Sequence, residues 1–401
     1  MPDSPRLGTE ADDLDLAPDT LAVHAGRGDL RSLGVHALPI DLSTTYPFAD
    51  LDGAVASLDA MMAGGGPTEG GSIYSRLHSP TVARFEDGLA AMEGTEAAVA
   101  FASGMAGITA ALLAARTLER NHVVGVRPIY GTTDRLLSSG TLGMEVTWTD
   151  AEGVAGAVRE DTALVCVETP VNPTLDLVDL ADIVRQAGGV PVMCDSTFAT
   201  PVLQNPAAQG VALVVHSGTK FIGGHGDVLA GIVACSEAWA SKLRGVRILT
   251  GGNVHPLAAY LLHRGLPTLP LRVRRAEETA TALAAHLSEH PRVSQVYHPS
   301  VPGRDPKGLV GTQMRGPGPM LSFEVRGGFE AADFLMRALR VITPAVSLGS
   351  TDTLIQHPAG LTQRVATGDA TGAITPGLLR LAVGLEDAED LWTDLLRGLP
   401  S

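Results

Sequence analysis

The chain has 401 residues, 45% of them hydrophobic, and a formal net charge of −15 at pH 7. A chain of this length and composition can bury one large core and a second, smaller one. Its acidic balance argues against nucleic acid or an anionic membrane surface as the main partner, and no run of 18 apolar residues is present that would cross a membrane.

The N-terminal segment Met1–Asp19 is acidic, contains proline and lacks the basic and apolar stretches of a signal peptide. We expect it to be a loose tail. The three cysteines, Cys166, Cys194 and Cys235, each stand in an apolar, strand-like run without Cys-x-x-Cys spacing. This pattern favours buried thiols over metal ligands or disulfides, and it predicts a reducing, cytoplasmic location.

The segment after the tail predicts an irregular arm and then two helices. Leu21–Arg27 and Pro39–Phe48 show little periodicity, whereas Asp50–Met62 has the pattern of one helix. The Gly-rich stretch Ala63–Gly71 lacks the Gly-Lys-Ser/Thr ending of a nucleotide-binding P-loop, so its glycines indicate a mobile loop rather than a phosphate cradle. Pro80–Glu93 predicts a helix that begins with proline, which the first turn tolerates.

Strands and helices then alternate as far as the last cysteine. The predicted strands are Ala97–Ala102, His122–Val126, Glu145–Thr149, Ala163–Glu168, Val190–Asp195, Leu213–His216 and Ala230–Cys235. The predicted helices are Met105–Leu118, Gly131–Ser139, Glu152–Arg159 and Leu177–Ala187. Because the strands are short, nearly continuous apolar runs separated by helices, they indicate an α/β fold with a mostly parallel sheet covered by helices.

The pattern changes near Gly265. The elements predicted after it are the long helix Leu271–Ser288, the strand Met320–Val325, the helix Phe329–Leu339, the strand Leu379–Val383 and the terminal helix Ala388–Leu399. Two strands with flanking helices predict a smaller C-terminal α+β domain. We therefore expect three parts: a tail and arm at residues 1–62, an α/β domain at residues 63–265, and a C-terminal domain at residues 266–401.

The stretch Val211–Asp227 places a lysine just past a buried strand. Lysine occurs three times in the chain, and Lys242 and Lys307 lie among polar residues as ordinary solvated charges. Lys220 instead follows an apolar run, with two hydroxyl side chains and then several glycines beside it. A cation at the end of a core strand is costly unless it pairs, deprotonates or bonds covalently. A lysine that caps a surface loop is the alternative.

Chemically useful residues stand at the ends of the other predicted strands, where doubly wound sheets bind their ligands. Ser103-Gly104-Met105 ends one strand and opens a helix, so backbone N–H groups are placed to bind an anion. The residues that follow the other strands are Tyr130, Glu168, Asn172, Asp195, Ser217, Thr219 and Lys220. We expect an anion site, an aromatic ring, a buried carboxylate and a lysine in one crevice.

These four groups are the ones that pyridoxal 5'-phosphate (PLP) requires: a lysine, a carboxylate beside the ring nitrogen, a phosphate site and often a stacked ring. A Rossmann dinucleotide site is the nearest competitor, but no Gly-x-Gly-x-x-Gly follows the first strand. His225 and His357 lack a second ligand at metal-binding spacing, so we expect them to be turn or helix-facing histidines and expect no metal site.

An ordered set of motifs runs through most of the chain. The motifs are Tyr74-Ser75-Arg76, Ser103-Gly104-Met105, Tyr130-Gly131, Glu168-Thr169-Pro170-Val171-Asn172-Pro173, Asp195-Ser196-Thr197, His216-Ser217-Gly218-Thr219-Lys220, Ser347-Leu348-Gly349, His357-Pro358-Ala359 and Arg380-Leu381-Ala382-Val383-Gly384. In this order they resemble the Cys/Met-metabolism PLP-dependent enzymes, a family that includes cystathionine γ-synthase, cystathionine γ- and β-lyase and methionine γ-lyase. The resemblance extends from about Leu21 to the C-terminus.

The resemblance implies a fold-type-I PLP-dependent transferase and a role for each matching position. Lys220 would form the Schiff base with the cofactor and shuttle protons. Asp195 would pair with the pyridine nitrogen, and Tyr130 would stack on the ring and act as acid or base for the leaving group. The amides of Gly104 and Met105 would hold the phosphate.

Further roles implied by the resemblance concern the phosphate, the substrate and the assembly. The hydroxyls of Ser217 and Thr219 would add to the phosphate site, and Tyr74 and Arg76 would reach it from a neighbouring subunit. The enzyme would then be a homotetramer, a dimer of dimers with shared active sites. Arg380 would bind the substrate α-carboxylate. The other implied positions are Ser347, Val346 and Glu168 at the substrate and Asn172 near the ring hydroxyl of PLP. For Ser347 and Asn172, turn formation is the alternative.

The substrate is less sharply implied, because the motifs depart from the family pattern in several places. Cystathionine-handling γ-enzymes of the family generally carry Glu where this chain has Val346, and methionine γ-lyases resemble this chain there. Against this, the Cys that follows Tyr-Gly in methionine γ-lyases is Thr132 here, and Arg247–Gly251 does not match their Lys-Asp-containing loop. The family's Asp-Asn-Thr is Asp195-Ser196-Thr197 here, a mild change.

We therefore expect γ-elimination on an amino acid that resembles L-methionine or homocysteine, giving 2-oxobutyrate, ammonia and a thiol. Cystathionine cleavage, or γ-replacement on an O-acyl-L-homoserine, is the alternative within the same fold. A PLP-binding protein without catalytic activity is a more remote alternative.

Overall fold

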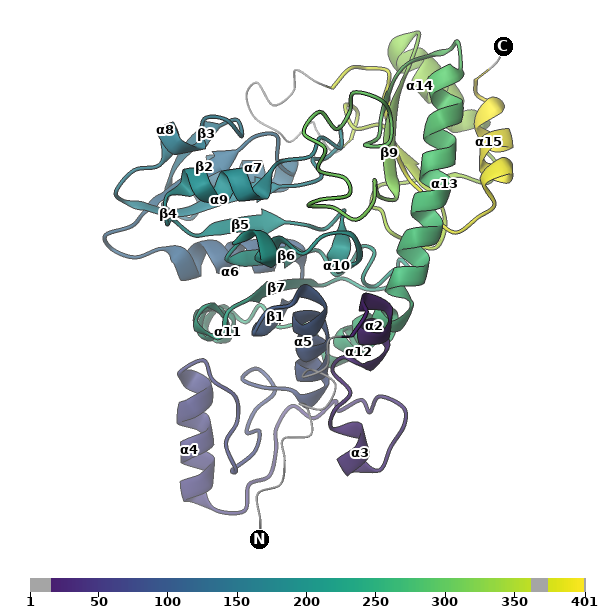
Figure 1. Ribbon diagram of the computed structural model, residues 1–401. Helices are drawn as coiled ribbons and strands as arrows, with labels where there is room; N and C mark the ends of the chain where they lie inside the picture. Colours follow the sequence, from purple (N-terminus) through teal and green to yellow (C-terminus); the bar gives the residue numbers. More distant parts are fainter. Residues whose placement is uncertain (1–15, 362–373, 400–401) are drawn as a thin grey trace. The chain divides into compact units, whose positions relative to one another are not determined.

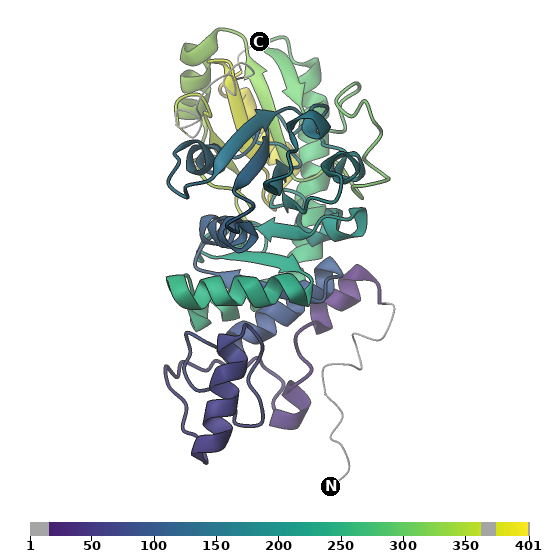
Figure 2. The ribbon, with the colours of Figure 1, turned by 90° about the vertical axis from the view of Figure 1, so that its left-hand side faces the viewer.

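The computed structural model describes residues 16–361 and 374–399, and these form two compact units (Figures 1 and 2). Unit 1 takes its residues from Met1–Ala115, Ala212–Gly223 and Asp227–Pro270, and unit 2 from Arg116–Val211, Gly224–Gly226 and Leu271–Ser401. Most of the predicted N-terminal tail lies outside the described residues. Its last two residues, Pro18 and Asp19, begin the helix α2 (Pro18–His24) instead of ending a tail.

The strands of unit 1 are β1 (Ala97–Phe101), β6 (Leu213–His216) and β7 (Gly231–Cys235), with β7 between the other two. Both pairings are antiparallel, and every residue of the three strands is buried. The apolar runs that predicted these strands therefore lie in the core of the unit.

Helices surround these strands in unit 1, where α5, α6 and α11 pack against β1 and β7 (Figure 1). The helices are α2, α3 (Leu30–Leu33), α4 (Leu51–Met62), α5 (Pro80–Glu93), α6 (Gly104–Ala115), α11 (Glu237–Thr250), α12 (Pro256–Gly265) and the short 3-10 helix η2 (Leu266–Thr268). Asp50 caps α4 by accepting the N–H of Gly53, and Ser236 caps α11 by accepting that of Trp239.

The Gly-rich stretch Ala63–Gly71 is anchored to two helices. The Ser241 hydroxyl and the Arg244 guanidinium, both on α11, donate to backbone carbonyls at its start, at 2.9 and 3.0 Å. The Ser57 hydroxyl on α4 donates to its last carbonyl, at 2.5 Å. These bonds hold both ends of the loop, and its mobility stays a prediction.

The first sheet region of unit 2 is parallel. Its strands are β2 (His122–Val126), β3 (Glu145–Thr149), β4 (Thr162–Glu168) and β5 (Val192–Asp195), in the order β5-β4-β2-β3. The connecting helices are α7 (Gly131–Ser138), α8 (Val154–Ala157) and α9 (Leu180–Ala187), and α10 (Thr200–Leu203) and the 3-10 helix η1 (Pro206–Gln209) follow β5. Parallel strands alternating with helices confirm the predicted α/β class.

The C-terminal part of unit 2 contains a five-stranded sheet. Its strands, in spatial order, are β10 (Thr343–Pro344), β11 (Leu354–Gln356), β12 (Leu378–Ala382), β9 (Met320–Val325) and β8 (Val293–Tyr297). The prediction of two strands was therefore too low. The accompanying helices are α13 (Leu269–Glu289), α14 (Gly328–Ala338) and α15 (Ala388–Leu396). The predicted domain bounds at residues 62 and 265 remain a prediction.

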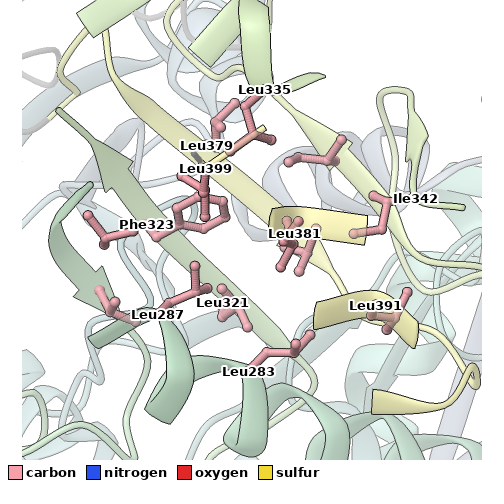
Figure 3. Close-up of a cluster of buried hydrophobic side chains, with 14 of the residues drawn as sticks. Leu283, Leu287, Leu321, Phe323, Leu335, Ile342, Leu379, Leu381, Leu391 and Leu399 are labelled. Carbon is pink, nitrogen blue, oxygen red and sulfur yellow. The ribbon is translucent and has the colours of Figure 1, made fainter. Parts of the chain in front are cut away.

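The core of this sheet is a cluster of leucines around Phe323, drawn in Figure 3. The helix α13 contributes Leu283 and Leu287, and α15 contributes Leu391, against Leu321 of β9. All five residues are fully buried, so these helices pack directly against the sheet. Cys166, Cys194 and Cys235 are also buried, as predicted. Among the described residues, no helix combines the length and apolarity of a membrane span.

Replacing Asp394 by alanine is expected to destabilise unit 2 by about 3 kcal/mol. Its buried carboxylate, on α15, accepts four contacts of 2.9 to 3.1 Å from the backbone N–H groups of three consecutive residues, Arg340, Val341 and Ile342. Alanine leaves these donors without an acceptor. Urea unfolding measures the loss, and Asp333→Ala, which removes only an exposed ion pair with Arg337, should cost less than about 0.5 kcal/mol.

Candidate active site

Lys220 lies on a turn that begins where β6 ends, in unit 1. Its backbone N–H donates to the carbonyl of Ser217 at 3.1 Å. The turn is tied to the residue before β7, because the Thr219 hydroxyl donates to the Ala230 carbonyl at 3.1 Å and accepts the Ala230 N–H at 3.0 Å. The lysine therefore stands on a fixed, half-buried segment at the end of a core strand, as the sequence predicts. The Thr219 hydroxyl is engaged within this turn.

The N-terminus of α6 adjoins the lysine turn. Ser103 caps this helix by accepting the Ala106 N–H at 3.1 Å, and a Cβ atom added to Gly104 would lie 3.2 Å from the Cβ of Ser217. A Cβ atom on Gly231 would clash with the carbonyl oxygen of Ser103. The two glycines thus let the helix start, the strand β7 and the turn approach closely, and the positive end of the 12-residue helix lies beside a serine hydroxyl. These donors fit a phosphate group.

A buried pair that sequence reasoning missed lies beneath the turn. His216, the last residue of β6, makes a 2.5 Å contact through Nε2 with the carboxylate of Glu93, the last residue of α5. Both side chains are at most 1% exposed. The pair joins the base of the lysine turn to a helix 123 residues earlier in the chain. No local sequence pattern signals a contact of this kind.

Tyr74 and Arg76 lie together in unit 1, in the segment between α4 and α5. The Arg76 guanidinium lies over the Tyr74 ring at 5.6 Å and donates to the Ile248 carbonyl at 2.7 Å. Tyr74 is exposed, and it makes an antiparallel bridge with Thr45. A role of these two residues toward a neighbouring subunit stays a prediction.

Two carboxylates stand side by side in unit 2, because Glu168 ends β4 and Asp195 ends β5 in matching register. Asp195 accepts the backbone N–H and the hydroxyl of Thr197, at 3.0 and 2.6 Å. Glu168 is buried, and its two oxygens accept the backbone N–H groups of Tyr130, at 2.6 Å, and Asn172, at 2.9 Å. The expected meeting of strand-end residues is therefore present in this unit.

The electrostatics of Glu168 follow from this burial. Desolvation and then the neighbouring Asp195 carboxylate raise the pKa of Glu168 to about 8. The backbone N–H groups of Asn172 and Tyr130 and the charge of Arg380 act in the opposite direction. Glu168 thus changes its protonation state in the neutral range, although an ordinary glutamate does so near pH 4.

Arg380 is buried on β12 and bonds to two segments of unit 2. Its guanidinium donates to the side-chain oxygen of Asn172 at 2.9 Å and to the carbonyl of Ser347 at 2.8 Å, and it lies 5.8 Å from the ring of Phe198. Ser347 has a φ of 86°, a left-handed conformation that serine rarely adopts. Burial lowers the pKa of Arg380 to about 10, which leaves it cationic at neutral pH. The adjoining Val346 is 52% exposed.

The structure thus groups the predicted residues within each unit. Unit 1 brings together Gly104, Met105, Ser217, Thr219 and Lys220, and unit 2 brings together Tyr130, Glu168, Asn172, Asp195, Ser347 and Arg380. The first group supplies a lysine and phosphate donors, and the second a carboxylate, an aromatic ring and a guanidinium. This donor set fits PLP and an amino-acid substrate.

His357, outside this set, has structural partners. His357 contacts the Pro376 carbonyl through Nε2 at 2.7 Å and accepts the Gly360 N–H through Nδ1 at 2.9 Å, so it holds a turn. Within the part of the chain that the structure describes, no three His, Cys, Asp or Glu side chains gather as a metal site would need.

Comparison with known proteins identifies the family. The family model described as "Cys/Met metabolism PLP-dependent enzyme" matches residues 19–400. A protein of Streptomyces avermitilis named L-methionine gamma-lyase is 53% identical over 381 residues, which cover 94% of this chain and 88% of that protein. One of Brevibacterium aurantiacum with the same name is 51% identical over 395 residues, covering 98% and 97%.

A solved structure resembles the chain over nearly its whole length. Cystathionine gamma synthase from Xanthomonas oryzae pv. oryzae, in complex with aminoacrylate and cysteine, superposes with a TM-score of 0.87 at 33% identity, covering 96% of this chain and 98% of that one. The sequence matches, the fold and the residues that fit PLP all indicate the same family. The chain belongs to the Cys/Met-metabolism PLP-dependent enzymes.

Proposed function

We propose that this chain is a PLP-dependent carbon–sulfur lyase that carries out γ-elimination on L-methionine. The observation that carries this proposal is the 51–53% identity to proteins named L-methionine gamma-lyase over 94–98% of the chain. The donor set in the two units supplies the groups that the reaction needs. Methionine and water would give methanethiol, 2-oxobutyrate and ammonia.

Lys220 and Asp195 have the central roles in this proposal. Bound PLP supplies an electron sink for the carbanion at the substrate Cα. Lys220 holds the cofactor covalently at rest, removes the Cα proton and moves a proton from Cβ. Asp195 keeps the ring nitrogen protonated, and its orientation is fixed by the two bonds from Thr197. General acid–base help of this kind typically contributes about 10²–10⁴-fold per group.

The remaining residues bind and orient. Tyr130 would stack on bound PLP and give a proton to the departing thiolate, and Arg380 would bind the substrate carboxylate as a planar fork. The N-terminus of α6, at Gly104 and Met105, would hold the phosphate together with the Ser217–Thr219 segment, and Asn172 would bind near the ring hydroxyl.

We also propose a homotetramer, a dimer of dimers in which Tyr74 and Arg76 serve the site of a neighbouring subunit. Large apolar side chains are exposed along the arm and α4: Ile40, Leu42, Phe48, Leu51, Val55, Leu58 and Met62. Exposed apolar surface of this extent is typical of an interface. Sedimentation measures the assembly, and a monomer at micromolar concentration would contradict it. Buried thiols support a cytoplasmic location.

The function is tested by assaying 2-oxobutyrate release from L-methionine, L-homocysteine, L-cystathionine and O-acyl-L-homoserines in parallel. We expect methionine to be turned over without an added thiol. The second candidate is γ-replacement, favoured by the likeness to the Xanthomonas synthase. Turnover only with an O-acyl-homoserine and an added thiol would assign replacement and rule out the lyase.

Val346→Glu is expected to shift substrate preference from methionine toward cystathionine by at least about tenfold in the ratio of kcat/KM values. Val346 is exposed beside Ser347, whose carbonyl holds Arg380. An apolar side chain suits a thioether tail, whereas a carboxylate would attract the second amino-acid head of cystathionine. Val346→Leu, which stays apolar, is the matched control and should keep the wild-type ratio. An unchanged ratio in the glutamate variant would contradict this role.

A further inference from the structure

Glu168 joins two backbone segments of unit 2 through one buried carboxylate. One oxygen accepts the N–H of Tyr130 at 2.6 Å, and the other accepts the N–H of Asn172 at 2.9 Å. Tyr130 precedes the first turn of α7, and Asn172 lies in the loop after β4. The side chain is 5% exposed. Both oxygens are therefore directed at the protein's own amides, in a position with little room for substrate.

The connection continues from Asn172 to Arg380. The backbone of Asn172 is held by Glu168, and its side-chain oxygen accepts the Arg380 guanidinium at 2.9 Å. The guanidinium also donates to the Ser347 carbonyl at 2.8 Å. A continuous set of bonds thus runs from Tyr130 through Glu168 and Asn172 to Arg380.

We propose that Glu168 is a positioning residue, which fixes the backbone of Tyr130 and, through Asn172, the guanidinium of Arg380, without binding the substrate itself. The inference rests on the proposed function, which gives Tyr130 and Arg380 their roles. It replaces the expectation that Glu168 contacts the substrate. The two hydrogen bonds that Glu168 accepts fix the position of Tyr130, the acid for the leaving group, relative to Arg380, which binds the substrate carboxylate.

The protonation state of Glu168 determines how many of these hydrogen bonds its carboxyl group can accept. The ionised carboxylate accepts both amides, whereas the protonated form turns an O–H toward an N–H and loses one bond. The charged groups that face Glu168 are Asp195 from β5, which opposes ionisation, and Arg380 from β12, which favours it. The arrangement therefore tightens as pH rises through the pKa of Glu168, so the acid limb of the kcat/KM profile carries its titration.

The raised pKa of Glu168 also determines whether the free energy of unfolding rises or falls with pH. Burial and Asp195 raise the pKa of Glu168 from 4.5 to about 8. Between these values the folded chain holds a proton that the unfolded chain has lost, so this group's contribution to the free energy of unfolding falls as pH rises. Glu168→Gln removes the titration. The difference in Tm between the variant and the wild type should shift in favour of the variant as pH rises across this window.

The first test measures amide hydrogen exchange in the wild-type full chain and in Glu168→Gln. We expect the amides of Tyr130 and Asn172 to be protected in the wild type at both pH 6 and pH 8, after correction for intrinsic exchange. In Glu168→Gln they should exchange at least about tenfold faster, while the amides of Arg340–Ile342 keep their protection. Wild-type amides at Tyr130 and Asn172 that exchange like exposed ones would overturn the proposal, even if the variant does not fold.

The second test measures kinetics with L-methionine. Glu168→Gln should lower kcat/KM by about 10- to 100-fold, with a higher KM, and should lose the acid limb. The control is Asp394→Asn. Asp394 is also a buried carboxylate that accepts backbone N–H groups, but it lies far along the chain from Glu168. Its substitution should lower Tm while keeping the wild-type pH profile. A Glu168→Gln enzyme with wild-type kcat, KM and pH profile would overturn the positioning role and leave the lyase assignment intact. Faster exchange in a protein without lyase activity would refute the proposed function alone.

Discussion

Lys220→Ala is expected to lower kcat for L-methionine by about 10⁴-fold or more. Lys220 has two tasks in the proposed reaction, holding the cofactor covalently and moving protons at Cα and Cβ, and alanine performs neither. The turn itself should persist, because its bonds are made by the backbone and by Thr219 with Ala230. The variant should therefore fold with a near wild-type Tm and bind PLP without a covalent bond.

The matched control is Lys242→Ala. Lys242 also belongs to unit 1, but its ammonium group lies 4.5 Å above the ring of Trp239, on the helix α11. We expect this variant to keep full activity. Borohydride followed by peptide mapping should label Lys220 in both the wild type and the control, and no lysine in Lys220→Ala. Cofactor fixed to Lys242 or Lys307 would contradict the assignment.

Some helices and strands could be predicted from the sequence, because their own residues indicate the secondary structure. His122–Val126, Leu213–His216 and Met320–Val325 form strands with the predicted bounds, because each is short and consists mostly of buried apolar residues. Pro80–Glu93 forms the predicted helix, since proline marks its start and Gly94 ends it in a left-handed conformation.

The strands that were missed, β8, β10 and β11, depend on their neighbours. β8 has two consecutive polar residues, Ser294 and Gln295, among its apolar ones and contains a register irregularity between Val293 and Gln295, so its pattern is weak. β11 has three residues and pairs with β12, and β10 has two residues and pairs with β11, so each depends on the edge that its neighbour offers. Segments this short have no periodicity from which a strand could be predicted.

In the candidate site, too, some contacts could be predicted from the sequence and others could not. Strand ends predicted that Glu168 and Asp195 would meet, since neighbouring parallel strands end at one edge. The partners of Glu168 were not predictable, because backbone amides carry no side-chain signal. The pair of His216 and Glu93 was missed for a related reason, since only the tertiary fold brings the two residues together.

Arg380→Lys is expected to raise KM for L-methionine by about 10- to 100-fold, with a smaller change in kcat. A guanidinium binds a carboxylate through two parallel bonds, whereas an ammonium is a single point charge. Lysine would also give up at least one of the bonds to Asn172 and Ser347 that fix the orientation of the group. The substitution therefore removes binding energy that the ground state and the transition state share.

Comparing L-methionine with L-methioninamide assigns this loss to the substrate carboxylate. The wild type should prefer methionine strongly, and Arg380→Lys should reduce that preference, because the amide lacks the charge that Arg380 binds. Arg304→Lys is the matched control, since Arg304 also donates to a backbone carbonyl, that of Thr174, and lies 4.5 Å from the ring of Tyr297. It should keep the wild-type KM. A wild-type preference in Arg380→Lys would mean that another residue binds the carboxylate.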